Sequence, residues 1–362
     1  MTAEEVLNDA KPPEDHSSDL IPGSTLEKTP TQHNHDAPPK KKNLPQIIAH
    51  RGYKALYPEN SMLAIEEAIK AGAHAIETDV HESKDGVVVL SHDPTLKRCF
   101  SLPAKISSCT WPYLSTLLTT SPPHVPLARL SDLLSYLSAT PSLSHIWILL
   151  DIKTDDDPSL TLVPAIARTI ASHPPPPDAS WTWQDRIVLG GWNENYLTSL
   201  GKELQGFKRA YIGFSLLYAN RFVDDEKWPG VGFNLLQQSL VGPVGRGFLE
   251  RVREGGKTER KVWVWTVNEE GWMRWCVGKG VDGGVTDDVG LLREVLDEEQ
   301  HCGGGKGKKK VTVGMYIKAA MVQILTVVLA VVIWGRLRKV GRVVEGEVKK
   351  KHEEKADTRE QC

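Results

Sequence analysis

The 362-residue sequence has little net charge and few cysteines. Its 44 basic and 46 acidic side chains give a formal net charge of −2, so it lacks the global positive field that attracts nucleic acid. The five cysteines are odd in number, and none stands in a C-x-x-C pair or at zinc-like spacing. A reducing compartment is therefore the simpler interpretation, and no zinc site is indicated.

The first residues, MTAEEVLNDAKPPEDH, also lack the pattern of a secretory signal. Acidic residues stand where such a signal has a basic region and then an apolar run. Residues 1–43 are rich in Pro, Asp, Glu, Lys and Ser and poor in aromatic residues, which predicts a disordered N-terminal arm. We expect the catalytic part to remain on the cytosolic side.

Residues 44–299 show short apolar runs that alternate with helix-like stretches, the pattern of a parallel α/β sheet. Nine runs are predicted strands: QIIAH, AIETDV, VVVLSH, IWILLDIK, RIVLGGW, RAYIGFS, GVGFNL, KVWVWTV and GGVTDD. Nine slightly exceeds the eight strands of a TIM barrel, and the short gap between Val80 and Val88 leaves no room for a crossover helix. Either one run is not a strand or one helix is missing. Amphipathic stretches after Asn60, Arg129 and Asn268 predict helices.

The composition changes again beyond residue 299. Residues 300–313 form a Gly/Lys-rich linker, 314–335 are apolar with Lys318 as the only charge, and 336–362 are a charged tail. The apolar segment predicts a membrane-anchoring transmembrane helix; a buried terminal helix or an interfacial helix are the alternatives. Basic residues flank both ends and could bind anionic lipid. We expect a membrane-associated chain at the ER, a mitochondrion or a lipid droplet.

Three carboxylates end two of the predicted strands. Glu77 and Asp79 are two residues apart, so they point to the same face, and Asp151 follows a wholly apolar run. Buried carboxylates side by side need a neutralising cation, and oxygen ligands favour Mg²⁺ or Ca²⁺. The alternative for Glu77 and Asp79 is that they are solvated carboxylates at the surface. The alternative for Asp151 is an internal ion pair with Lys153.

Two histidines end other strands near these acids. His50 and His92 each follow an apolar run, which suggests a general base and a general acid, although a lone histidine is more often structural. Arg51 suits bidentate contact with phosphate oxygens, and Lys153 could bind a substrate anion. These side chains together indicate phosphoryl chemistry.

The ordered motifs HRG…PEN, GAHAIETDV, KDGVVVLSHD, LDIK, VWTVN and GVTDD, within residues 47–288, resemble the glycerophosphodiester phosphodiesterase family. The resemblance implies a TIM (β/α)8 barrel with His50 and His92 as the acid/base pair and a divalent metal held by Glu77, Asp79 and Asp151. It also implies substrate contacts by the residues Arg51, Lys153, Glu59 and Trp265. Glu59 could instead belong to a turn and helix cap, and Trp265 could be a core residue.

Two departures from the family pattern concern the ligands and the pocket. Asp151 stands where most members carry Glu, although the related sphingomyelinase D enzymes also have Asp there. Gly191 and Trp192 stand where Ser-Phe is frequent, which affects the expected substrate range.

Narrower features, YKALYPEN, ETDV, LLDIK and the apolar C-terminal segment, are similar to the phosphatidylglycerol-specific phospholipase C branch. That similarity implies cleavage of a membrane lipid to diacylglycerol and glycerol 3-phosphate, in lipid degradation. The alternatives are a glycerophosphodiester phosphodiesterase or lysophospholipase D acting on soluble or lyso substrates. An inactive membrane-bound binding module is the alternative of another class.

Overall fold

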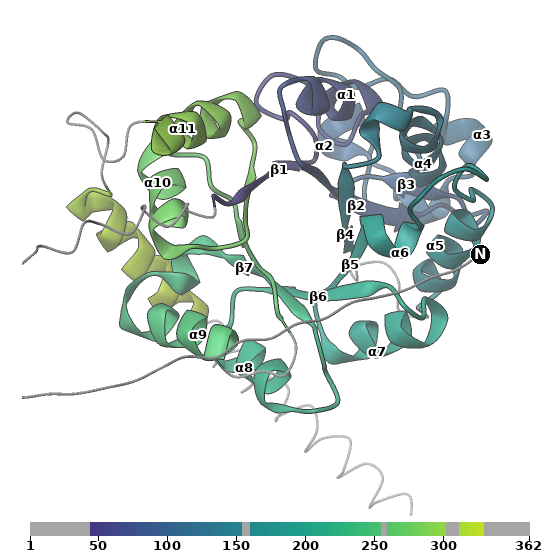
Figure 1. Cartoon of the computed structure of the whole chain (residues 1–362). Coiled ribbons are helices and arrows are strands. Elements are labelled where there is room, and N and C mark those ends of the chain that lie inside the picture. The colour runs from purple at the N-terminus through teal and green to yellow at the C-terminus, as the bar shows by residue number, and fades with distance from the viewer. Residues whose placement is uncertain (1–43, 154–159, 255–258, 302–310, 329–362) are drawn as a thin grey trace, which may run out of the picture. The chain divides into compact units, whose positions relative to one another are not determined.

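The computed structural model describes residues 44–153, 160–254, 259–301 and 311–328. The predicted N-terminal arm (1–43), most of the linker and the charged tail (336–362) lie outside the described residues. In the view of Figure 1, the strands form a ring and the helices lie outside it.

Eight parallel strands close into a barrel, which confirms the predicted TIM-barrel fold. Their order around the barrel is β1-β9-β8-β7-β6-β5-β4-β2, and β1 pairs with β2 to close the ring. The barrel strands are β1 (Gln46–His50), β2 (Ala75–Glu82), β4 (Trp147–Ile152), β5 (Ile187–Gly191), β6 (Lys208–Gly213), β7 (Gly232–Leu236), β8 (Val262–Trp265) and β9 (Gly283–Thr286).

The ninth strand, β3 (Val88–Leu90), is real but lies outside the ring. It runs antiparallel to the end of β2, with Val80 opposite Leu90 and Glu82 opposite Val88. An antiparallel partner needs only a tight hairpin and no crossover helix. Neither explanation offered for the nine predicted strands was right, because both assumed that every strand was parallel.

Inward-facing side chains form an apolar layer low in the barrel. A buried cluster joins one side chain from each of seven strands: Ile48, Ala75, Leu149, Val188, Ala210, Trp263 and Val285. Because side chains alternate along a strand, the next inward positions toward the carboxyl ends lie two residues further on, at His50, Glu77 and Asp151. The strand periodicity thus places the polar residues on top of a closed apolar floor.

The helices cover the outside of the barrel, where a second and larger apolar cluster packs between them and the strands. The predicted helices are present as α1, α4 and α10. Among the described residues up to 301, the helices of four or more residues are α1 (Met62–Lys70), α2 (Lys97–Phe100), α3 (Trp111–Leu114), α4 (Leu130–Ala139), α5 (Leu162–Ala171), α6 (Trp183–Arg186), α7 (Glu194–Glu203), α8 (Leu216–Asp224), α9 (Gly242–Glu254), α10 (Glu270–Lys279) and α11 (Val289–His301). Short 3₁₀ turns are η1 (Ile106–Ser108), η2 (Pro141–Leu143) and η3 (Gln237–Leu240).

The C-terminal segment predicted to cross a membrane is helical from residue 313 to residue 328. Its remaining residues, 329–335, lie outside the described residues. Within the described ranges, the structure contains no helix with the length and apolar character needed for a membrane span.

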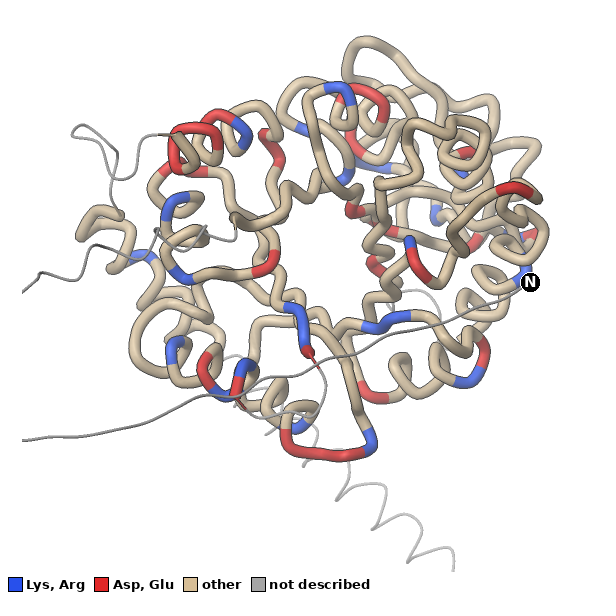
Figure 2. The backbone as a smooth tube through the Cα atoms, in the orientation of Figure 1, with Lys and Arg blue, Asp and Glu red and all other residues tan. Residues whose placement is uncertain are grey.

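Figure 2 marks the positions of charged residues along the backbone, and basic and acidic positions are interspersed around the outer ring. No broad region of one sign is visible from this side, which agrees with the near-zero net charge of the sequence. The charged residues that could take part in a reaction lie inside the barrel, at the carboxyl ends of its strands.

Candidate active site

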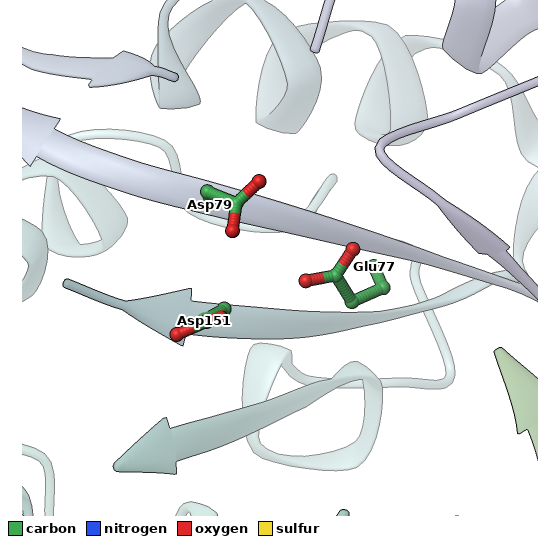
Figure 3. Close-up of side chains that lie close together, drawn as sticks. All are labelled: Glu77, Asp79 and Asp151. Carbon is green, nitrogen blue, oxygen red and sulfur yellow. The ribbon is translucent and has the colours of Figure 1, made fainter. Parts of the chain in front are cut away.

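Three buried carboxylates meet at the carboxyl ends of β2 and β4, where ligands bind in this architecture. Glu77 and Asp79 lie on β2, and Asp151 lies on β4 directly opposite Asp79 in the parallel register. Each offers an oxygen within 4.8 Å of the others, and all three side chains are buried. Figure 3 shows the three side chains close together on the two neighbouring strands.

Two cations stand against this acidic group. Lys153 Nζ lies 2.9 Å from Asp79 Oδ1 and 2.7 Å from Asp151 Oδ2. Arg51 Nε lies 3.1 Å from Asp79 Oδ2. Burial opposes ionisation of Asp79, but Lys153 and Arg51 outweigh it and lower the pKa of this carboxyl. The internal ion pair considered for Asp151 and Lys153 therefore exists, and it lies inside the carboxylate group.

Glu77 is the member of the group that the two cations compensate least. Burial, followed by repulsion from Asp79 and Asp151, raises its pKa well above the ordinary value. Burial also raises the pKa of Asp151. A set of three inward carboxylates with two raised pKa values fits a hard divalent cation, because such an ion would favour their ionised forms. Glu77, Asp79 and Asp151 are the residues that could hold it.

Arg51 reaches the site through an unusual backbone conformation. Consecutive side chains of a strand point to opposite faces, yet His50 and Arg51 both line the same cavity. Arg51 has a φ of 59°, in the left-handed region, and its backbone N–H donates to Glu77 at 2.9 Å (O) and 3.1 Å (Oε2). This turn after β1 breaks the alternation and brings both basic side chains to one place.

His50 is held by an aspartate from the other end of the chain. Its Nδ1 donates to Asp287 Oδ1 at 2.5 Å, which leaves Nε2 for a substrate. Burial lowers the pKa of His50, although the contact with Asp287 opposes this effect. A neutral imidazole with one nitrogen fixed by a carboxylate is the arrangement expected of a general base.

His92 reaches the cavity because β3 turns back toward the barrel. Backbone N–H of Ser91 donates to Asp79 O at 3.0 Å, so the hairpin returns the chain to the mouth beside the carboxylates. His92 Nδ1 donates to Asp93 Oδ1 at 2.8 Å. Each of the two histidines therefore has an aspartate that orients its ring, and His92 is the more exposed of the two.

Glu59 binds arginines and does not cap the next helix. Its carboxylate accepts from Arg51 at 2.9 Å and from Arg98 at 2.7 and 2.8 Å. The cap of α1 is Ser61, whose hydroxyl accepts from the Ala64 N–H. Ser61 thus performs the cap role considered for the PENS stretch, whereas substrate contact by Glu59 stays a prediction.

Two tryptophans form a wall of the cavity. The cavity has a volume of about 150 Å³ and is lined by His50, Arg51, Glu77, Asp79, His92, Asp151, Lys153, Trp192, Ile212, Asn234, Trp265 and Val285. Trp192 Nε1 donates to Asp151 Oδ1 at 2.7 Å, and its ring lies edge-on to Trp265 with centroids 6.0 Å apart. Trp265 is therefore a lining residue, and its Nε1 donates to Asn234 O at 3.0 Å.

Sequence reasoning assigned no role to several side chains of the site. Asn60 donates to Asp79 Oδ2 at 3.0 Å and accepts from the Thr78 hydroxyl at 2.8 Å, so it fixes one carboxylate. Asp287 lay inside the quoted GVTDD motif, where two acids after a strand end were the available signal. Arg98 had no signal, because its partners become neighbours only in the folded chain.

Comparisons with known proteins concern the family and the fold of the chain. The model of the glycerophosphoryl diester phosphodiesterase family matches residues 50–291. A glycerophosphodiester phosphodiesterase of Caldanaerobacter subterraneus is 26% identical over 252 residues, which is 68% of this chain and 95% of that protein. A human lysophospholipase D is 39% identical, but only over 82 residues, 22% of this chain and 26% of that protein.

Solved structures support the same fold. A glycerophosphodiester phosphodiesterase of Thermotoga maritima has a TM-score of 0.55 and 26% identity, and covers 69% of this chain and 98% of that one. A phosphodiesterase of Oleispira antarctica, in complex with the product sn-glycerol-3-phosphate, has a TM-score of 0.56 and 20% identity, and covers 70% and 97%. The family match spans well over half of the sequence, and the chain therefore belongs to the glycerophosphoryl diester phosphodiesterase family of phosphoric diester hydrolases.

Proposed function

We propose that this enzyme is a phospholipase C that cleaves phosphatidylglycerol to diacylglycerol and glycerol 3-phosphate. The observation that carries the phosphodiesterase part is the group of three buried carboxylates beside two cations, with two oriented histidines lining the same cavity. The lipid part is supported by the sequence similarity to the phosphatidylglycerol-specific branch and by the size of the cavity. At about 150 Å³ it is smaller than the roughly 300–1,000 Å³ of common ligand pockets, so it suits a polar headgroup without its acyl chains.

Substrate binding follows from the charges of the cavity. Arg51 and Lys153 point at the carboxylates and are the cations available to phosphoryl oxygens. Trp192 and Trp265 supply a flat apolar surface for the carbon skeleton of the headgroup. A Mg²⁺ or Ca²⁺ ion held by Glu77, Asp79 and Asp151 would stabilise the negative charge that develops on the phosphoryl oxygens.

The proton transfers can be assigned to the two histidines. We assign His50 Nε2 to take the proton from the headgroup hydroxyl beside the phosphoester, which then attacks phosphorus. The more exposed His92 gives a proton to the oxygen of the departing diacylglycerol. In the second step the roles reverse: His92 takes a proton from water, the water opens the cyclic phosphate, and His50 returns a proton to the headgroup oxygen. Asp287 and Asp93 keep each ring in the required tautomer.

Product analysis on phosphatidylglycerol vesicles tests the proposal. We expect diacylglycerol and glycerol 3-phosphate, loss of turnover on chelation, and loss of turnover in His92→Ala. The matched control is His145→Ala, because His145 is an exposed histidine just before β4, at the other end of the barrel. Phosphatidic acid as the product, or full activity of His92→Ala, would overturn the proposal.

A second candidate is hydrolysis of soluble or lysophospholipid glycerophosphodiesters, which the same cavity could perform. The local likeness to the human lysophospholipase D favours it. Glycerophosphoglycerol and lysophosphatidylglycerol belong in the same product assay, and a preference for either over phosphatidylglycerol would select this candidate. An inactive binding module is disfavoured, because the acid, base and ligand positions are all filled and clustered.

A further inference from the structure

Exposed large apolar side chains gather around the mouth of the barrel. Within the described residues of the barrel domain, those most exposed are Leu217 (84%), Val244 (74%) and Leu56 (63%), followed by Leu118 (56%). Leu56 follows β1, Leu217 lies in the first turn of α8 after β6, and Val244 lies in the first turn of α9 after β7. In a barrel of parallel strands all such positions lie on the face that carries the active site.

These residues lie on opposite sides of the catalytic cavity. The strands β1 and β6 are four places apart in the ring of eight, so the segments that follow them, with Leu56 and Leu217, lie on opposite sides of the mouth. Leu56 shares a surface hollow with Arg98 and Thr119, next to Leu118. We call the four residues Leu56, Leu118, Leu217 and Val244 the apolar rim.

An apolar groove extends the rim on the β6 side. It has a volume of about 750 Å³, and Leu216, Leu217, Tyr218 and Val244 line it together with Val327. Its lining also includes Phe214, which follows the cavity residue Ile212 by two positions. The catalytic cavity and the groove are thus neighbours on one face of the barrel.

The helix of residues 313–328 is bound to the same face with its apolar side outward. Gln323 Nε2 donates to the carbonyls of Gln238 and Val241, which follow β7, at 2.6 and 2.9 Å. Met321 and Ile324 remain 65% exposed, whereas a water-facing helix turns such residues to the core. The sequence then continues with the apolar stretch LAVVIW and four basic residues between 336 and 342.

We propose that the apolar rim docks the barrel on a phospholipid bilayer, with the catalytic cavity facing the headgroups. The apolar residues lie on opposite sides of a polar cavity. A bilayer fits this arrangement, because its polar headgroups can contact the cavity while its apolar interior takes up the surrounding apolar side chains. The amino-acid sequence beyond residue 328 supports the same partner, since an apolar run followed by basic residues matches acyl chains and anionic headgroups. The proposal deepens the proposed function, because it explains how a lipid headgroup reaches the cavity.

Hydrogen exchange of the full-length protein with and without phosphatidylglycerol vesicles tests the docking surface directly. Vesicles should slow exchange in the loops around Leu56 and Leu217, and leave the segment at residues 140–146, before β4 at the opposite end of the barrel, unchanged. If both loops exchange at the same rate with and without vesicles, the proposal is overturned, even where the protein binds vesicles through its C-terminal segment. Protection of the same loops that increases with protein concentration in the absence of vesicles would also overturn the proposal. The surface would then bind a second copy of the chain.

A triple variant of the apolar rim provides a second test of the docking surface. Leu56→Gln/Leu217→Gln/Val244→Gln should lower activity on phosphatidylglycerol vesicles about tenfold or more, because burial of one leucine alone is worth roughly a factor of ten. Activity on dissolved glycerophosphoglycerol should be retained, because none of the three residues lines the catalytic cavity. The control His145→Gln should change neither activity. Equal losses on both substrates, or no loss on vesicles, would contradict docking by the rim.

The two proposals fail in different ways. If the loops are protected by vesicles but phosphatidylglycerol is not cleaved, the docking surface stands and the proposed substrate is wrong. If phosphatidylglycerol is cleaved and the loops are not protected, the substrate stands and the docking surface is wrong.

Discussion

His50 and Asp287 lie 237 residues apart in the chain, yet His50 Nδ1 and Asp287 Oδ1 are 2.5 Å apart. The contact forms where β1 and β9, the first and last strands of the barrel in the sequence, pair with each other, so it depends on the folded barrel. Asp287 also accepts from Asn268 at 2.9 Å and lies 3.3 Å from Lys54, which fixes its own orientation. Asp287 is therefore a positioning residue for the proposed base.

Asp287→Asn should lower kcat about 10²- to 10⁴-fold while the protein remains folded, because the amide no longer holds His50 in the required tautomer. Steady-state kinetics on the cleaved lipid measures this effect. The control Asp297→Asn changes an exposed residue of α11 and should leave kcat unchanged. Equal kcat values for the two variants would show that Asp287 does not position the base.

Metal binding should stabilise the fold through Asp151. Addition of Mg²⁺ or Ca²⁺ at 100 times Kd should raise the free energy of unfolding by about 2.7 kcal/mol, seen as a rise in Tm. Asp151→Asn should remove most of this rise, because it takes one charge from the three-carboxylate group. Asp151→Glu keeps the charge and restores the residue frequent in the family, so it should retain the rise. If the metal stabilises Asp151→Asn as much as it stabilises the wild type, the ion binds elsewhere.

Arg98 joins the two sides of the site, since it binds Glu59 at 2.7 Å and Asp93 at 2.7 Å. Arg98→Gln should lower kcat about tenfold, because Glu59 and Asp93 then orient Arg51 and His92 less well. Arg168→Gln is the control, since that side chain is 65% exposed and lies 4.0 Å from the Glu82 carboxylate. The expectation fails if both variants keep the kcat of the wild type.

Gly52 is required by the packing of α1. Its φ is +83°, and a Cβ atom would lie 2.6 Å from the Ala64 backbone carbon. Gly52→Ala should therefore lower the free energy of unfolding by about 3 kcal/mol, measured in urea. Gly278→Ala is the control: a Cβ there meets nothing within 4 Å, and in a helix it should stabilise by about 0.5–1 kcal/mol. Similar midpoints of urea unfolding for the two variants would contradict this explanation.

The stability of the wild type should fall at acid pH partly through Asp93. Burial opposes ionisation of Asp93, but hydrogen bonds from Arg98 and His92 outweigh it and lower the pKa to about 2, from 3.8. A lowered pKa contributes stability that is present above pH 4 and is lost as the pH falls through about 2. After discounting for solvent screening, the contribution is about 1 kcal/mol. Asp93→Asn should be less stable than wild type at pH 6, and the difference should shrink as the pH falls and vanish below about pH 2; a constant difference would refute the linkage.

The sequence was sufficient for much of the site because strand periodicity is a local property. Side chains two residues apart share a face, so Glu77 and Asp79 had to point together, and the apolar run before Asp151 had to be buried. The family motifs then assigned roles that periodicity alone left open. The same local signals located all nine strands that the described part of the chain contains, including the one outside the barrel.

Gly52 illustrates a local signal whose cause the sequence leaves open. A glycine directly after His50 and Arg51 indicates that the backbone there comes close to other atoms. The structure shows that the close neighbour is Ala64 of α1, so the glycine serves packing of the fold. Sequence reveals that space is scarce at such a position but not what fills it.

What the sequence determined by itself was the kind of chemistry: the carboxylates, histidines and cations, and the strands that carry them. Only the tertiary structure decided that β3 is antiparallel and brings His92 back to the mouth, that Asp287 meets His50, and that Leu56 and Leu217 lie on one face. The physical reason is the range of the forces involved. Alternation and apolar burial act between neighbours in the chain, whereas strand pairing and side-chain contacts join residues that only the closed barrel brings together.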